Sequence, residues 1–257
     1  MNDVRTGECV VRVPLGDMAR VTYGFPYGVI YRADLHQLFL DACKAQPGVT
    51  LRTSARVESF EQSESGVTVR LASGEGGAGS GETLHGNALI GADGMWSRIR
   101  EAVVGDGKPR VSGHIAYRAV LKRDEVPAHL WSDDVTLWGG EKTHLVHYPL
   151  RRGELFNLVA VFHSNKYDEG WNTFGDTAEL NERFADACPQ VRELLGQIDT
   201  WTLWVMCDRD PVNNRTDRRG PVSGDAPPPM RQYPTTASGQ AASLHVALSA
   251  ALACHHS

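Results

Sequence analysis

Asp93 stands in a turn that could bind the hydroxyl groups of a ligand. An apolar run at residues 88–90 is followed by Gly-Ala-Asp-Gly at residues 91–94 and then by residues that open a helix. Glycine lets a ligand come close to the backbone because it carries no Cβ. Ligands of open α/β sheets gather at the carboxyl ends of strands. Asp93 and Gly94 are therefore candidates for holding a ribose or ribityl chain. The alternative is that Asp93 only caps the following helix.

A second set of polar side chains lies in a segment with the alternation of a strand. His144, Val146 and Tyr148 are two residues apart, so a strand places them on one face and His147 on the other. Histidine titrates near neutral pH, which suits it to acid–base chemistry. The alternative for His144 is a half-exposed histidine of the sheet.

The chain before residue 113 combines short strand-like segments with two helices, the second of them at residues 96–104. The strand-like segments are residues 8–31, 49–52, 55–61, 66–71 and 87–90, and the last is apolar enough to be a buried strand. From Arg32 the apolar residues fall on one helical face, until Pro47 and Gly48 end the helix. The Gly/Ser/Ala-rich residues 73–81 predict a flexible loop.

The chain after residue 113 predicts a mainly antiparallel sheet with one face covered and one face open to a ligand. Its strand-like segments are residues 114–121, 135–138, 144–150, 154–162 and 201–207. Residues 151–153 have a suitable length for a hairpin connection. Helices are predicted at residues 176–188 and 190–198. The predicted fold class is thus α/β (α+β).

Composition excludes several classes of function. The net charge of −5 gives no electrostatic footprint for nucleic acid. No apolar run reaches membrane-spanning length, and the N-terminus lacks the apolar core of a signal peptide. Five scattered cysteines predict reduced thiols in a cytoplasmic protein. No metal site is predicted, and the composition gives no indication of the oligomeric state.

Residues 88–100 resemble the Asp-Gly motif of the flavin-dependent aromatic hydroxylases, the single-component FAD monooxygenases with the p-hydroxybenzoate hydroxylase fold. Three further segments, at residues 31–35, 143–150 and 224–233, also resemble the family, and all four occur in the family's order. Within the family the chain is most similar to the salicylate and 3-hydroxybenzoate hydroxylases. The resemblance covers residues 10–233 and implies a partial FAD-binding Rossmann-like domain beside a substrate-binding sheet.

The resemblance implies FAD as cofactor, with NADH or NADPH as co-substrate and O2 as oxidant. Carried over residue by residue, it places Arg32, Val57, Asp93, Gly94 and Asp225 at the FAD. Structural alternatives stay open for two of them. Arg32 could be a helix-start residue or a surface ion-pair partner, and Val57 could be a core valine of a strand.

The resemblance also implies a substrate, a small aromatic acid such as a hydroxybenzoate or salicylate. His144 matches the family position of a base that deprotonates the phenolic hydroxyl, and Tyr148 matches its companion on the same strand. Gln232 matches a substrate contact. Arg118 is a further candidate that could face the substrate carboxylate.

Two departures from the family pattern bear on activity. No Gly-x-Gly-x-x-Gly motif follows an N-terminal strand, so we expect an N-terminally truncated chain with weakened FAD binding. After residue 214 the sequence is altered, and residues 226–229 read Ala-Pro-Pro-Pro where the family has Ala-Ala-His-Pro. The alternative function is thus an inactive remnant, at most a small-molecule-binding domain.

The expected domains follow from these segments. Residues 1–112 form a partial FAD-binding domain whose strands at residues 8–31 cross to the substrate side. Residues 113–207 form the substrate-binding sheet. Residues 208–257 are an altered and poorly ordered return to the FAD domain.

Overall fold

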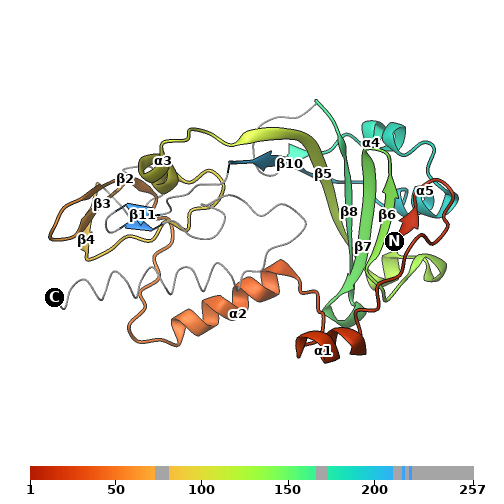
Figure 1. Cartoon of the computed structure of the whole chain (residues 1–257), viewed down its shortest axis with the longest axis horizontal. Coiled ribbons are helices and arrows are strands. Elements are labelled where there is room, and N and C mark those ends of the chain that lie inside the picture. The colour runs from red at the N-terminus through yellow and green to blue at the C-terminus, as the bar shows by residue number, and fades with distance from the viewer. Residues whose placement is uncertain (73–80, 166–172, 211–215, 218–219, 222–257) are drawn as a thin grey trace. The chain divides into compact units, whose positions relative to one another are not determined.

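The structure is a computed structural model, and it describes residues 1–72, 81–165, 173–210, 216–217 and 220–221. Its fold is mixed α/β, as the sequence predicts. The chain divides into two compact units, which are described separately (Figure 1). The first consists of Met1–Pro47 and Gly113–Met206, and the second of Gly48–Ser112 and the described residues from 207 onward. No described helix has both the length and the apolar character needed to cross a bilayer.

The main sheet has the strand order β1-β6-β7-β8-β5-β10-β9. Its strands are β1 (Asn2–Asp3), β5 (Arg110–Lys122), β6 (Thr136–Gly140), β7 (Thr143–Leu150), β8 (Leu155–His163), β9 (Thr173–Phe174) and β10 (Thr202–Asp208). Strands β6, β7, β8 and β5 pair antiparallel in turn, while β1 pairs parallel with β6. The prediction of a mainly antiparallel sheet is confirmed. Short 3-10 turns connect the strands at η1 (Arg123–Glu125), η2 (Ala128–Leu130) and η3 (Arg151–Gly153).

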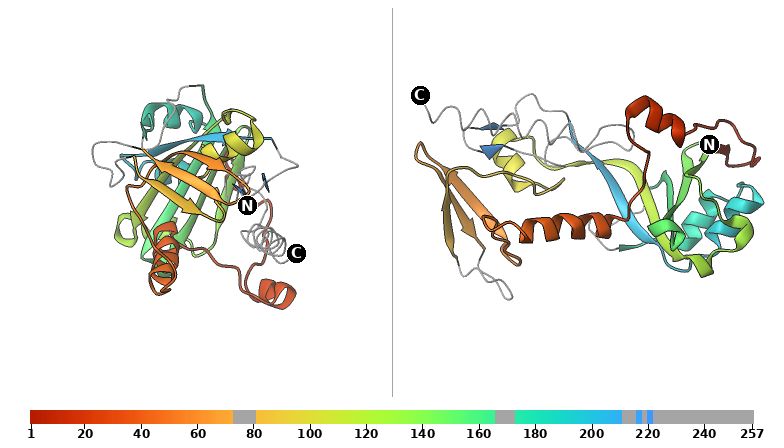
Figure 2. Two further views of the ribbon diagram at one scale, coloured as in Figure 1. Left: turned by 90° about the vertical axis from the view of Figure 1, so that its left-hand side faces the viewer. Right: turned by 90° about the horizontal axis from the view of Figure 1, so that it is seen from below.

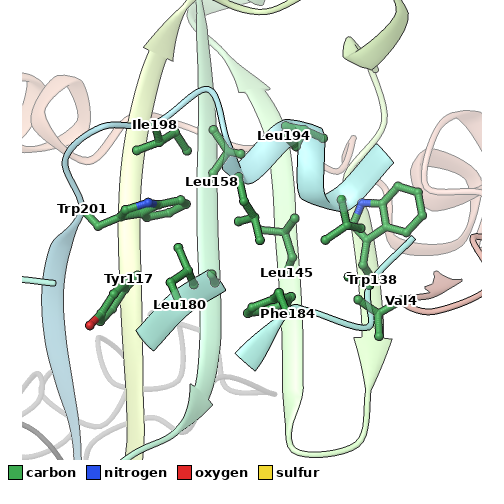
Figure 3. Packing of buried hydrophobic residues seen from close by; sticks show 14 of the residues in the cluster. Val4, Tyr117, Trp138, Leu145, Leu158, Leu180, Phe184, Leu194, Ile198 and Trp201 are labelled. Carbon is green, nitrogen blue, oxygen red and sulfur yellow. The ribbon is translucent and has the colours of Figure 1, made fainter. Parts of the chain in front are cut away.

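One face of this sheet is covered by helices α4 (Thr177–Arg183) and α5 (Pro189–Leu195). Figure 3 shows Leu145 and Leu158 of the sheet beside Leu180, Phe184 and Leu194 of the helical segment. Helix α4 begins where the sequence predicts it, and the Asp176 carboxylate caps it by accepting the backbone N–H of Ala178 at 2.9 Å. The apolar residues that alternate along each strand and point toward the helices thus form the core.

The buried leucine Leu158 gives a direct test of this core. Leu158 is fully buried, whereas Val120 of the neighbouring strand is 42% exposed. We expect Leu158→Ala to lower the free energy of unfolding by about 2–5 kcal/mol because it leaves a cavity. The control Val120→Ala should change it by less than about 1 kcal/mol. Urea unfolding followed by circular dichroism measures both values, and equal losses would contradict this assignment of faces.

The N-terminal segment differs from the prediction of strands over residues 8–31. The structure forms helix α1 (Asp17–Tyr23) there, and only a single β-bridge joins Cys9 to Asn2. Asp17 lies in the first helical turn, where a carboxylate is favourable, and Gly24 ends the helix with a φ of +77°. These two signals outweigh the alternation of apolar and polar residues before Asp17.

Helix α2 (Arg32–Lys44) is confirmed, and its first turn is tied to the main sheet's connection η3. Arg151 donates from Nε to the Asp34 carboxylate at 2.7 Å, and its guanidinium lies 5.0 Å from the Tyr31 ring centre. Together with the β1–β6 pairing, this places residues 1–47 in the unit of the sheet. The sequence predicts residues 1–112 as a partial FAD-binding domain in which residues 8–31 cross to the substrate side. The apolar face of α2 is exposed, with Phe39 at 60%.

The second unit contains a three-stranded antiparallel sheet, visible in both views of Figure 2. Its strands are β2 (Val57–Gln62), β3 (Val67–Leu71) and β4 (Thr83–Gly86), and the unit also holds α3 (Arg98–Val104), β11 (Thr216–Asp217) and β12 (Gly220–Pro221). The predicted strands at residues 49–52 and 87–90 are wrong. Neither segment has a partner strand among the described residues, and Ile90 is 40% exposed.

Candidate functional site

Asp93 caps helix α3 in the second unit. Its carboxylate accepts the backbone N–H of Arg98 at 2.8 Å and of Ile99 at 3.3 Å, and also the hydroxyl of Ser97. Ser97 in turn accepts the backbone N–H of Arg100 at 2.9 Å. The helix-capping alternative therefore describes part of what Asp93 does. Asp93 is nevertheless exposed, and its carboxylate has an acceptor site beyond these three contacts that a ligand could use.

The two glycines around Asp93 have different roles. A Cβ on Gly91 would lie 2.6 Å from Cβ of Ile99, so glycine is needed for the close packing of this segment on α3. Gly94 has a φ of +77°, and no atom of a described residue other than its chain neighbours lies within 4 Å of the position of its missing Cβ. The turn is thus packed on one side and open at Gly94. This fits a ligand, such as FAD, that lies against the backbone.

A buried charge network holds the Asp-Gly turn, and sequence reasoning missed it. Arg100 is fully buried and donates from Nε to the Asp106 carboxylate at 3.0 Å. Arg209 donates to the same carboxylate at 3.0 Å and to the Met95 carbonyl at 2.9 Å. The hydrogen bond from Arg100, with the charges of both arginines, keeps the pKa of Asp106 below its usual range. No spacing rule links residues 106 and 209, which are distant in the sequence.

The other predicted FAD residues are placed as follows. Val57 begins β2 and is half-buried, and Arg32 is exposed at the start of α2. Val57 and Asp93 lie in the second unit, whereas Arg32 lies in the first. Asp225 and the predicted substrate contact Gln232 lie outside the described residues.

The face of the main sheet opposite α4 and α5 carries His144. Cross-strand pairing joins His144 to Val161, which in turn pairs with Ala116, and joins Val146 to Val159. We call this surface, which carries Ala116, Val146, Val159 and Val161, the open face. Trp204 and Met206 pack against Ala116, Val159 and Val161, which are buried, whereas Val146 is half-buried. Leu145 lies on the covered face, as the alternation predicts.

Two polar atoms on the open face are buried and have no hydrogen-bond partner among the described residues. They are Nε2 of His144 and Nδ2 of Asn157, which pairs across the strands with Tyr148. Burial, and to a lesser degree His114, lowers the pKa of His144 below its ordinary value of 6.5. His144 is therefore neutral at pH 7, and it can accept a proton from a bound group.

Cationic side chains lie farther along the open face. Arg118 pairs across the strands with Val159, and its guanidinium lies 4.7 Å from the Trp204 ring centre. Arg118 is exposed to solvent. The protein atoms around its guanidinium lower the pKa of Arg118 by desolvation, and the charge of Arg32 also lowers it. Among the described residues no carboxylate is paired with Arg118. Two neighbouring guanidinium groups are thus available to an anion.

The spacing between His144 and Arg118 suits a small ring. The two residues are two strands apart and differ by two positions along the strands, so their α-carbons are about 12 Å apart. The apolar side chains of the open face lie between them. Burial raises the pKa of Tyr148, so its hydroxyl stays protonated and can donate a hydrogen bond at the Arg118 end.

His147 lies on the covered face and has a structural role. Its Nε2 accepts the indole N–H of Trp138 at 3.0 Å, and its ring lies 5.0 Å from that of Phe156. His147 also lines a pocket of 990 Å³, together with Trp131, Thr136 and Trp138. That pocket contains neither His144 nor Tyr148 in its lining.

His147 makes stability depend on pH. Burial lowers its pKa to about 4, from 6.5 in the unfolded chain. Between these values the unfolded state binds more protons, so stability falls as the pH is lowered from 6.5 to about 4, by about 3 kcal/mol. We expect His147→Gln to reduce this loss, whereas His129→Gln, at an exposed histidine, should retain it. Urea unfolding at pH 7, 5.5 and 4.5 measures the difference, and identical slopes would contradict it.

Comparisons with known proteins agree with the motifs. A family model described as the FAD binding domain matches residues 19–252. 3-Hydroxybenzoate 6-hydroxylase 1 of Aquipseudomonas alcaligenes is 39% identical over 231 residues, which are 90% of this chain and 57% of that protein. A 3-amino-4-hydroxybenzoate 2-monooxygenase of Streptomyces platensis is 34% identical, over 92% of this chain and 57% of its own length. The chain thus spans somewhat over half the length of these relatives.

Solved structures share the fold. Klebsiella pneumoniae HpxO complexed with FAD and uric acid matches with a TM-score of 0.73 and 24% identity, over 89% of this chain and 56% of that one. A salicylate hydroxylase substrate complex matches with a TM-score of 0.70 and 23% identity, over 89% of this chain and 56% of that one.

Proposed function

Because this chain belongs to the family described as the FAD binding domain, we propose that it takes part in flavin-dependent hydroxylation of a small aromatic acid. The substrate carries a phenolic hydroxyl and a carboxylate, as the hydroxybenzoates named for its relatives do. One oxygen atom of O2 enters the ring and the other leaves as water, with NADH or NADPH supplying two electrons. FAD, when bound, supplies the oxygen activation.

The observation that carries this proposal is the arrangement of the open face. A neutral histidine whose buried Nε2 has no partner among the described residues stands at one end of an apolar surface. Arg118, which is paired with no described carboxylate, stands at the other. An aromatic acid offers a partner to both His144 and Arg118. Its ring packs on Val146 and the apolar side chains beside it, its carboxylate faces the guanidinium and its phenolic hydroxyl donates to His144.

Each side chain then has a distinct task. His144 accepts the phenolic proton at Nε2 and leaves a phenolate, whose ring is more electron-rich and more readily attacked by an electrophilic oxygen. Arg118 and Tyr148 hold the carboxylate and so fix which ring carbon is presented. The apolar side chains of the open face exclude water from the ring.

For the cofactor we propose the Asp93–Gly94 turn, with Val57 of the same unit as a further contact, and Arg32 stays a prediction of the family resemblance. The open backbone at Gly94 and the exposed carboxylate of Asp93 support this assignment. The described cysteines, at positions 9, 43, 188 and 207, form no disulfide with one another, and we propose the cytoplasm as the site of action.

Labelled oxygen tests the proposal. The chain is incubated with FAD, NADH, 3-hydroxybenzoate and ¹⁸O2, and the products are analysed by mass spectrometry. We expect a dihydroxybenzoate that carries one labelled oxygen. Binding of 3-hydroxybenzoate without labelled product would instead favour a binding domain without turnover. Absence of both binding and product would contradict the proposed function.

A further inference from the structure

Asn157 is the polar residue of the open face to which neither the sequence motifs nor the proposed chemistry gives a role. It lies on β8 between the core residues Phe156 and Leu158, so its side chain has the opposite orientation from theirs. Cross-strand pairing places it beside Tyr148 on β7 and Val120 on β5. Asn157 is therefore directly across the strands from Tyr148, and Arg118 is two positions away along the strands, in the next row of cross-strand pairs.

The side-chain amide of Asn157 lacks a hydrogen bond that a buried amide normally makes. Its Nδ2 is buried and has no hydrogen-bond partner among the described residues. A buried amide that makes no hydrogen bond is unfavourable, so such groups normally meet a protein atom, an ordered water or a ligand. Two further unpartnered atoms, on His147 and Trp201, belong to residues of the covered face. Asn157 and His144 are the two on the open face.

The side chains around Asn157 indicate which kind of ligand group its amide could bind. Tyr148 is a protonated hydroxyl donor, because burial raises its pKa, and Arg118 in the adjacent row is a cation. An amide N–H, a phenol O–H and a guanidinium together form a set of donors with no described carboxylate among them. Such a set matches the two oxygens of a carboxylate, which offer several acceptor positions.

We propose that Asn157 is a specificity-determining residue that donates its Nδ2–H to the carboxylate of the aromatic acid. The inference rests on the proposed function and deepens it. Arg118 attracts the anion, while the directional hydrogen bond from Asn157 fixes the carboxylate beside Tyr148. The site then selects ring acids over phenols without a carboxylate, because these leave the buried amide unpartnered.

The test compares two probes on the full chain by calorimetry, 3-hydroxybenzoate and phenol. We expect Asn157→Leu, which keeps the size of the side chain and removes the donor, to raise the Kd for 3-hydroxybenzoate by about tenfold to a hundredfold. The Kd for phenol should change by less than about threefold. Asn157→Asp should weaken the acid at least as much, because its carboxylate repels that of the ligand.

Asn2→Leu is the matched control, since Asn2 is a strand residue of the same sheet at its β1 edge. It should leave both Kd values unchanged, and thermal unfolding checks that every variant folds. Equal effects of Asn157→Leu on acid and phenol, or no effect on either, would overturn the role of Asn157 while the proposed function stands. Failure of the unmodified chain to bind 3-hydroxybenzoate at all would instead overturn the proposed function, and this inference with it.

Discussion

The His144→Gln variant is expected to bind 3-hydroxybenzoate and to hydroxylate it about a hundredfold to ten-thousandfold more slowly than the unmodified chain. Glutamine is polar and of similar size, but it cannot take up the phenolic proton. The buried Nε2 of His144, which lacks a described partner, is the atom that we expect to accept it. Without that acceptor the ring stays a neutral phenol, which is less reactive toward electrophilic oxygen.

Absorbance of the bound ligand separates this role from a merely structural one. Phenolates absorb at longer wavelength than phenols, so a titration shows the pH at which bound 3-hydroxybenzoate ionises. Since the pKa of His144 lies below 6.5, the histidine stays neutral and active down to that range, and activity should fall as it becomes protonated at lower pH. His129→Gln, at an exposed histidine bonded to Glu193, should change neither readout. A phenolate band unaltered in His144→Gln would show that another group is the base.

The Arg118→Met variant is expected to lose about a hundredfold in affinity for 3-hydroxybenzoate. Charge-assisted hydrogen bonds between guanidinium and carboxylate are among the strong ones, and methionine preserves much of the apolar stem. Affinity for phenol should be nearly unchanged, because it has no carboxylate. Calorimetric titration of both ligands measures the two effects.

Arg123 offers a matched control for this variant. Its guanidinium also lies over an indole, 4.0 Å from the ring centre of Trp131, but it belongs to η1 and not to the open face. Arg123→Met should therefore leave the affinity for the acid unchanged. If both variants weaken binding equally, Arg118 acts through the general charge of the protein and not as a carboxylate contact.

The alternation of residues along β7 could be predicted because it follows from the period of a strand. His144 and Tyr148 lie on one face and His147 on the other, since a strand that buries Leu145 leaves no other arrangement. The helix from Arg32 was equally predictable from its apolar spacing and from Pro47, which follows shortly after its last residue, Lys44. Each of these features depends on neighbours along the chain.

Features that depend on long-range partners were not predictable. Residues 87–90 look like a buried strand but have no partner strand among the described residues. The Arg100–Asp106–Arg209 network and the unpartnered amide of Asn157 appear only when separate segments are brought together. The capping of α3 by Asp93 was one of two roles that the sequence left open, and the hydrogen bonds now show it.

The most direct test of the account is the position of 3-hydroxybenzoate bound to the chain, determined by crystallography. The account predicts the phenolic oxygen within hydrogen-bond distance of His144 Nε2 and the carboxylate at Arg118, on the open face. A ligand in the pocket of Trp138 and His147 on the covered side, or one with its carboxylate at His144, would contradict it.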